Sequence, residues 1–237
     1  MATFGSTNFS INRDDTIKRA LRLIGVLPQG ESPSTDQVTE ASLALNGLVK
    51  AWQADGMPLW AIRTSSFTLT ATSSYTVGIG QTINISKPLK VLQAWNRNTT
   101  SNVDIPMRIL TKDEYNRLGN KTSTGNPIQL YYDPGIDTGT IYLFPVPDTT
   151  SIANQTIYFT HQRTFEDFDS STDTPDFPQE WYDAVVYGLA CRLAPEYGVA
   201  PTDRKLLWQE MTIIKNEAMS FGTEEGSLFF GVDFREY

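Results

Sequence analysis

The sequence predicts an α+β protein in which terminal helices pack into one α-helical bundle with an inserted antiparallel β-sandwich or barrel. Apolar residues repeat at helical spacing in residues 13–52, at every second position in residues 64–163, and at helical spacing again in residues 178–221. Each amphipathic segment must bury its apolar face, so helices at both ends of the chain favour a shared core. We expect N-terminal bundle helices in residues 1–62, a β-subdomain in 63–164, C-terminal bundle helices in 165–221 and an extended tail in 222–237.

Two helices are expected before residue 56. The first spans residues 13–26, and Asp14 lies in its first turn, where negative charge is favourable. Ser34 and Gln37 have the spacing of a capping box, which predicts the start of a second helix that ends before Gly56. The expected apolar stripes are Ile17, Ala20, Leu21 and Ile24 in the first helix, and Val38, Ala41, Leu45, Leu48, Val49 and Trp52 in the second.

The alternation of apolar residues in residues 64–163 predicts about seven short strands. One short helix is expected among them, at residues 112–118. Turn clusters such as Asp133-Pro134-Gly135 separate the strands, and Gly78-Ile79-Gly80 is expected in a hairpin turn. The alternating apolar residues are Phe67 and Leu69; Tyr75, Val77 and Ile79; Ile83 and Ile85; Ile105, Met107 and Ile109; Leu130 and Tyr132; Ile141 and Leu143; Ile157 and Phe159.

Two further helices follow, and they supply the expected packing residues. Pro178 suits a helix start, and the helix after it is apolar on nearly all sides. The next helix begins near Thr202 and has the 4-3-4-3 apolar spacing of a packed seam. We expect contacts between helices or between subunits at Trp181, Val185, Leu189, Leu207, Met211 and Ile214.

The composition argues against DNA recognition and membrane insertion. The formal net charge is -8, which repels phosphate backbones. Residues 1–14 lack the basic start and apolar stretch of a signal peptide. The longest apolar run contains Arg192 and is shorter than a membrane span. We therefore expect a protein that is made in a cytoplasm and does not insert into a membrane.

The sequence offers little for catalysis, and we expect neither enzymatic activity nor a cofactor. His161 is the only histidine and Cys191 the only cysteine, and no nucleophile-elbow motif accompanies them. Glu180, Asp183 and Glu196 are close enough in sequence to be considered for a peptidoglycan hydrolase.

Two binding alternatives remain open. The acidic loop of residues 166–176 has carboxylates that calcium would accept, but it fails the EF-hand pattern, since Thr172 stands at the glycine position. A solvated acidic loop is the favoured interpretation. Five aromatic residues suggest a carbohydrate-binding adhesion module, although a β-core explains them more simply: Trp60, Tyr75, Trp95, Tyr131 and Tyr132.

Several segments resemble the head-to-tail adaptor proteins of short-tailed bacteriophages, the tail accessory factors and tail tubular A proteins. The resemblance spans residues 13–221. It is carried by residues 21–27, 45–60, 130–134 (Leu-Tyr-Tyr-Asp-Pro), 141–147 and, above all, 176–198, with Asp-Phe-Pro-Gln-Glu-Trp-Tyr-Asp-Ala followed by Leu-Ala-Pro-Glu-Tyr-Gly.

This resemblance implies a structural virion protein at the head-to-tail junction, assembled in the host bacterial cytoplasm. It implies a homo-oligomeric ring of twelve copies, with the phage portal protein above and the tail nozzle or tail-tube protein below. DNA would pass through the channel without specific binding. The long β-region rich in threonine, serine and asparagine departs from the family pattern.

The last sixteen residues have no regular period, and they contain a strip of apolar side chains. Exposed strips of this kind are usually binding sites. We therefore expect contact with the portal or with a neighbouring subunit at Leu228, Phe229, Phe230, Val232 and Phe234.

Overall fold

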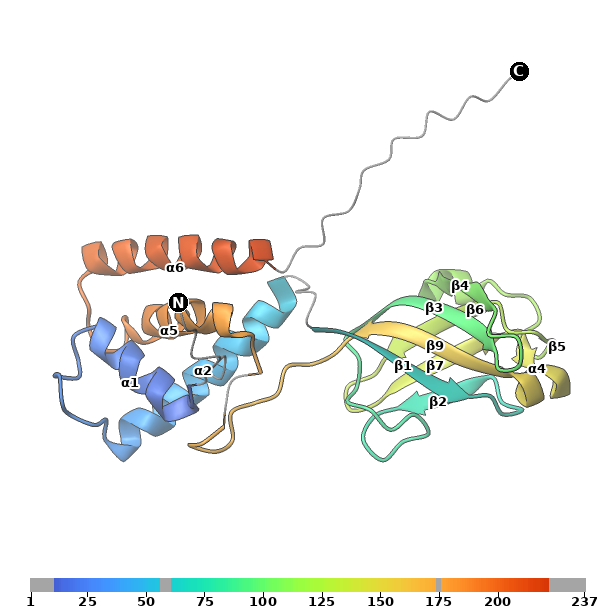
Figure 1. The fold of residues 1–237 in the computed structure, drawn as a ribbon. Helices are drawn as coiled ribbons and strands as arrows, with labels where there is room; N and C mark the ends of the chain where they lie inside the picture. Colours follow the sequence, from blue (N-terminus) through green and yellow to red (C-terminus); the bar gives the residue numbers. More distant parts are fainter. Residues whose placement is uncertain (1–10, 56–60, 174–175, 222–237) are drawn as a thin grey trace, which may run out of the picture. The chain divides into compact units, whose positions relative to one another are not determined.

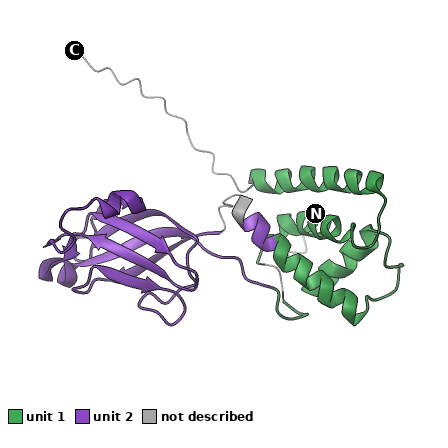
Figure 2. Ribbon diagram, turned by 180° about the vertical axis from the view of Figure 1, so that it is seen from behind, with its two compact units in different colours: residues 1–48, 168–237 green, residues 49–167 purple. Residues whose placement is uncertain are grey.

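The computed structural model describes residues 11–55, 61–173 and 176–221. The chain divides into two compact units (Figures 1 and 2). One unit comprises Met1–Leu48 with Phe168–Tyr237, and the other comprises Val49–Asp167. Over the described residues this is a mixed α/β protein, with six α-helices and a large curled sheet that is mostly antiparallel.

The first helix, α1 (Arg13–Leu23), has a defined cap at each end. The Asn12 side chain accepts a hydrogen bond of 2.8 Å from the Asp15 backbone N–H. Gly25 has a φ of 74°, which lets the N–H of Val26 bond the carbonyl of Leu21 at 3.1 Å. The predicted end at residue 26 was therefore wrong, because this glycine turns the chain out of the helix.

The second helix, α2 (Thr35–Asp55), begins with the predicted capping box. The Gln37 N–H donates to Ser34 Oγ at 3.3 Å, and the Ser34 N–H donates to Gln37 Oε1 at 2.9 Å. The expected apolar stripe is confirmed for Ala41, Leu45, Leu48, Val49 and Trp52, which are all buried. Val38 is half-buried.

Two helices follow the β-region. A short 3₁₀ turn (Gln179–Trp181) leads from Pro178 into α5 (Tyr182–Leu193), and α6 (Pro201–Phe221) comes next. In the helical unit α5 contacts both α1 and α6. Only Asp183 and Arg192 are exposed on α5, so the prediction of a helix buried on nearly all sides is confirmed.

The β-unit contains one seven-stranded sheet in the order β1-β9-β3-β4-β6-β7-β2 and a small parallel pair, β5-β8. The strands are β1 (Ile62–Thr68), β2 (Ser74–Val77), β3 (Lys90–Asn98), β4 (Asp104–Leu110), β5 (Thr124–Gly125), β6 (Gln129–Pro134), β7 (Gly139–Phe144), β8 (Val146–Pro147) and β9 (Gln155–Gln162). Two short helices, α3 (Lys112–Asn116) and α4 (Thr149–Asn154), connect them.

The sheet curls so that its two edges share one core. Phe67 on β1 and Tyr75 on β2 lie on opposite edge strands, yet their ring centroids are 4.8 Å apart. Phe159 on the neighbouring strand β9 packs against Phe67 at 6.0 Å. The core draws buried residues from every strand of the large sheet.

Two features of the sheet were not predicted. Strand β3 lies near its centre, but a bulge between Val91 and Gln93 interrupts the alternation, so the buried side chains are Val91, Ala94 and Asn96. Strands β4 and β6 pair in parallel, with α3 in the connection between them, so the sheet is not purely antiparallel.

Strand β4 also differs from the expected alternation, since Ile105 is exposed whereas Met107 and Leu110 are buried. Its first half pairs with β3 and its second half with β6, so the strand changes partner along its length. Helix α4 was missed as well, although the Asp148 side chain caps it by accepting from the Ser151 N–H at 2.7 Å.

Candidate assembly surfaces

Three of the predicted packing residues lie within the core of the helical unit. Trp181, Val185 and Leu189 are buried, and the Trp181 ring lies 6.2 Å from that of Phe177. Apolar residues from several elements of the unit are buried with them, including Ile17 of α1. These side chains therefore pack inside a single copy of the chain.

The other three, Leu207, Met211 and Ile214, lie on α6 and are half-buried. Ala218, later on the same seam, is buried. The sequence thus identified the side of α6 that faces inward. It missed the outward apolar residues of this helix.

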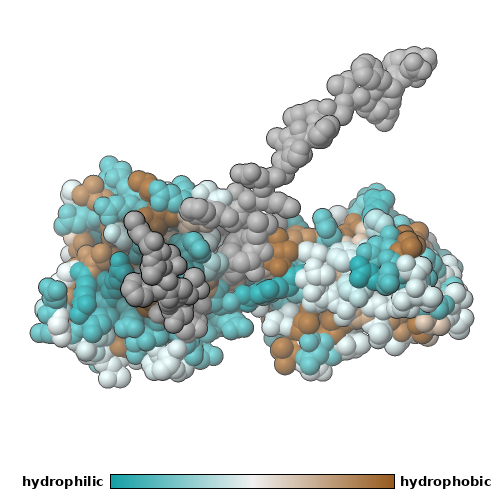
Figure 3. Space-filling model, viewed as in Figure 1, coloured by the Kyte–Doolittle hydropathy of each residue, from teal (hydrophilic) through white to brown (hydrophobic). Residues whose placement is uncertain are grey.

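Three large apolar side chains of α6 are exposed: Leu206 (56%), Trp208 (59%) and Ile213 (59%). Apolar residues interrupt the hydrophilic surface over α6 in Figure 3. Large apolar side chains that are exposed on one side of a helix, such as those of Leu206 and Ile213, often mark a contact surface. One available signal was spacing, because Leu206 and Ile213 are seven residues apart and therefore share a side of the helix.

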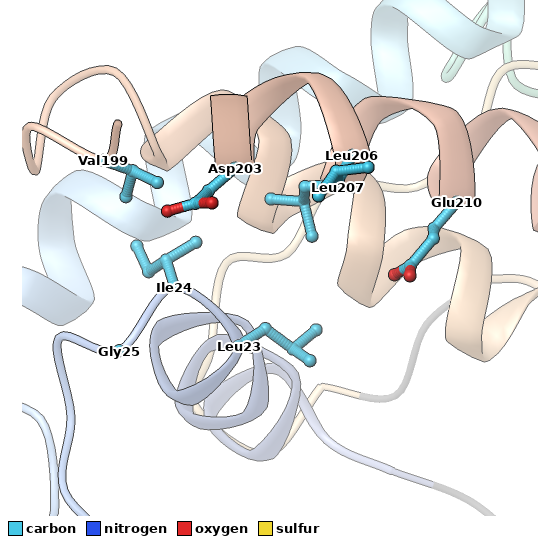
Figure 4. A pocket seen from close by; sticks show the side chains of 8 residues that line it. All are labelled: Leu23, Ile24, Gly25, Val199, Asp203, Leu206, Leu207 and Glu210. Atoms are coloured by element: carbon cyan, nitrogen blue, oxygen red, sulfur yellow. The ribbon is translucent and has the colours of Figure 1, made fainter. Parts of the chain in front are cut away.

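A groove of about 380 Å³ lies between the C-terminal end of α1 and the first turns of α6 (Figure 4). Its apolar lining comes from Leu23 and Ile24 on one side and from Leu206 and Leu207 on the other. Asp203 and Glu210 of α6 also line the groove. Figure 4 shows side chains from both elements directed toward this space.

The predicted tail contacts, Leu228, Phe229, Phe230, Val232 and Phe234, lie outside the described residues. The same holds for Trp60.

His161 is buried in the β-unit, and its Nε2 lies 3.0 Å from Ser65 Oγ. Burial lowers the pKa of the imidazole below its ordinary value of 6.5. The Nδ1 atom is buried without a hydrogen-bond partner. The ring also packs against Phe159, with centroids 5.2 Å apart, so His161 is part of the core.

Cys191 lies on α5, and burial raises the pKa of its thiol to about 11. The thiolate, which is the nucleophilic form, is therefore disfavoured at neutral pH. Cys191 is half-buried and serves as a small packed side chain of the helical unit.

The three carboxylates considered for hydrolysis are all exposed in the helical unit. Asp183 pairs with Arg19 at 3.3 Å, while Glu180 and Glu196 are exposed. Among the described residues, no group of three or more histidine, cysteine, aspartate or glutamate side chains is arranged to hold a metal ion.

The acidic loop is bonded to its surroundings. Asp173 Oδ2 accepts from the backbone N–H groups of Asp169 (2.9 Å) and Ser170 (2.6 Å). Asp167 forms an ion pair with Lys50 of α2 at 2.7 Å. These carboxylates therefore serve local structure.

Two of the five aromatic residues considered for sugar binding belong to the core of the β-unit. Tyr75, Tyr131 and Tyr132 are buried. Trp95 is half-buried on the outer side of β3, where its ring stacks on Tyr158 with centroids 5.7 Å apart. The core interpretation is confirmed for Tyr75 and Tyr132. Tyr131 is buried outside that core, where its ring stacks on those of Tyr115 (5.0 Å) and Tyr142 (5.7 Å).

None of the described helices combines the length and hydropathy that crossing a membrane requires. The described residues form a two-unit α/β protein with exposed apolar side chains along one helix and a groove beside it.

A sequence profile of the SU10 adaptor protein family matches residues 12–220, and the chain belongs to this family of phage head-to-tail adaptors. The family is a structural component of the virion and not an enzyme family. No protein among the curated sequences matches the chain. The resemblance noted in the sequence is thereby confirmed.

Proposed function

We propose that this chain is a head-to-tail adaptor subunit that assembles as a ring of twelve copies, joins the portal to the tail nozzle or tail tube, and leaves a channel for DNA. The observation that carries this proposal is the family match over residues 12–220. The ring lies at the head-to-tail junction, and its subunits are made and assembled in the host cytoplasm.

Each part of the chain has a role in this proposal. Residues 1–62 and 165–221 form one helical bundle that builds the ring, and residues 63–164 form a β-subdomain available for contacts along or around it. The contact of α5 with both α1 and α6 supports the bundle. Trp181, Val185 and Leu189 stabilise it from inside.

The tail of residues 222–237 reaches the portal or a neighbouring subunit. Leu228, Phe229, Phe230, Val232 and Phe234 give it enough apolar surface to offset the entropy lost when a chain becomes ordered on binding.

DNA passes through the ring without specific binding. The net charge of -8 supports this, because an acidic lining repels the phosphate backbone and does not retain it.

The test is reconstitution from purified components. Purified subunit mixed with its purified portal should elute as a complex with several subunits per portal. A subunit that stays monomeric at high concentration in the presence of its portal would contradict the proposal.

A further inference from the structure

Helix α6 has two exposed flanks with different chemistry. At about 100° per residue, Trp208 lies about 200° around the helix from Leu206, so the two side chains leave α6 on nearly opposite sides. The inward seam of Leu207, Met211 and Ile214 lies between these directions, facing the rest of the helical unit.

The flank with Leu206 is apolar and acidic. Asp203 and Glu210 line the groove beside it, and Glu217 follows at the same seven-residue spacing on the same side of the helix. These three carboxylates have no ion-pair partner in the part of the chain that the structure describes. The groove thus combines an apolar floor with uncompensated negative charge.

The opposite flank is apolar and basic. The Trp208 side chain is 59% exposed, and Lys205, one turn earlier, is exposed on the same side. Lys205 likewise has no ion-pair partner among the described residues.

We propose that Trp208 of one copy inserts into the groove between α1 and α6 of the next copy, with Lys205 beside the carboxylates of Asp203 and Glu210. This inference rests on the proposed ring and identifies the surfaces that form it. The occupant is a second copy of this chain. The Trp208 side chain and the positive charge of Lys205 on one flank complement the apolar groove and the negative charges of Asp203 and Glu210 on the other flank.

Trp208 and the groove lie on opposite flanks of α6, and this placement favours a ring over a two-fold dimer. A contact between two different surfaces repeats from copy to copy and closes when the rotation at each contact divides a full turn. Tryptophan is common among the residues that dominate binding energy, particularly where a pocket excludes water around it.

The experiment compares charge variants that cannot self-assemble separately but can assemble together. The first variant is Lys205→Glu, and the second carries Asp203→Lys and Glu210→Lys. In the first variant alone, Glu at position 205 of one copy meets Asp203 and Glu210 of the next. In the second variant alone, Lys205 of one copy meets the two introduced lysines of the next, so like charges repel at every contact. In a mixture, alternating copies place opposite charges at every contact.

Wild type and variants are studied by native mass spectrometry with and without portal, and circular dichroism confirms that each is folded. We expect each variant alone to stay at subunit mass, and the equimolar mixture to recover the wild-type assembly. Trp208→Ala should weaken assembly by about thirtyfold or more. Leu43→Ala, at an exposed leucine of α2, is the matched control and should assemble normally.

Two outcomes overturn the inference in different ways. If wild type assembles and both charge variants and Trp208→Ala assemble equally well, the ring exists but uses other surfaces. If folded wild type never assembles, even with portal, the proposed ring fails and this inference fails with it.

Discussion

Asn96 is buried at the end of the curled sheet, where its side-chain amide holds three segments together. Its Nδ2 donates to Asn126 Oδ1 (2.8 Å), to the Pro127 carbonyl (3.4 Å) and to Gln155 Oε1 (2.6 Å). Replacing a buried donor of this kind lowers the free energy of unfolding, because its acceptors would be left without partners.

We therefore expect Asn96→Asp to lower the free energy of unfolding at neutral pH by about 3 kcal/mol, since a carboxylate would face three acceptor oxygens. Asn98→Asp is the matched control on the same strand. Asn98 Oδ1 only accepts, from the N–H groups of Thr100 and Ser101, and a carboxylate can accept equally well. Urea denaturation measures both, and equal stability of the two variants would refute the role given to Asn96.

His161 makes the stability of the β-unit depend on pH. Burial lowers its pKa in the folded protein below 6.5, so the unfolded chain binds the proton more tightly. The stabilising contribution is complete above pH 6.5 and is lost as the pH falls from 6.5 through the folded-state pKa.

His161 is the only histidine, so His161→Gln should flatten this dependence. Denaturation at about pH 7.5 and about pH 5.5 tests the expectation, because this interval spans the ordinary histidine pKa. An unchanged pH slope in the variant would show that other groups cause it.

Among the elements, the end of α1 depends on one backbone conformation. Gly25 has a φ of 74°, a region that side chains with a Cβ disfavour, and open space surrounds the position of that Cβ. Gly25→Ala should therefore cost about 1 kcal/mol through backbone strain alone.

Gly119→Ala is the matched control for the addition of a Cβ atom. It also has open space around the Cβ position, but its φ lies outside the strained region. Thermal denaturation should show a loss of stability for Gly25→Ala and little change for Gly119→Ala. Similar losses in both would point to a cause other than the left-handed turn.

The helices other than α4 and many strands could be predicted because each signal is local. The Ser34 and Gln37 capping box and the alternation of Ile141 and Leu143 need only neighbouring residues. Strand β3 was missed because its bulge breaks the period. The parallel pairing of β4 with β6 depends on which distant segments meet, and a local period carries no such information.

One feature of the candidate surfaces could be predicted from local spacing, and the others depend on how distant segments pack. The inward seam of α6 follows from the spacing of Leu207, Met211 and Ile214. The groove was not predictable, because it forms where the end of α1 approaches α6, and these segments are far apart in the sequence. The exposure of Trp208 likewise depends on how α6 lies in the helical unit.

At the scale of the whole molecule, the tail can be tested separately from the folded units. Deleting residues 225–237 should give a soluble, folded subunit that no longer holds the portal, because the apolar anchors are removed while the buried residues of both units remain. Circular dichroism and portal co-elution measure the two properties. A truncated chain that unfolds, or that binds the portal as well as the full chain, would contradict this role.

The central claim is that the chain joins head and tail, and locating the subunit in the intact virion tests it most directly. An electron cryomicroscopy reconstruction of the particle should show both described units fitted into density between the portal and the tail, repeated twelve times around the axis. Density for the subunit elsewhere in the particle, or a junction filled entirely by other proteins, would contradict the account.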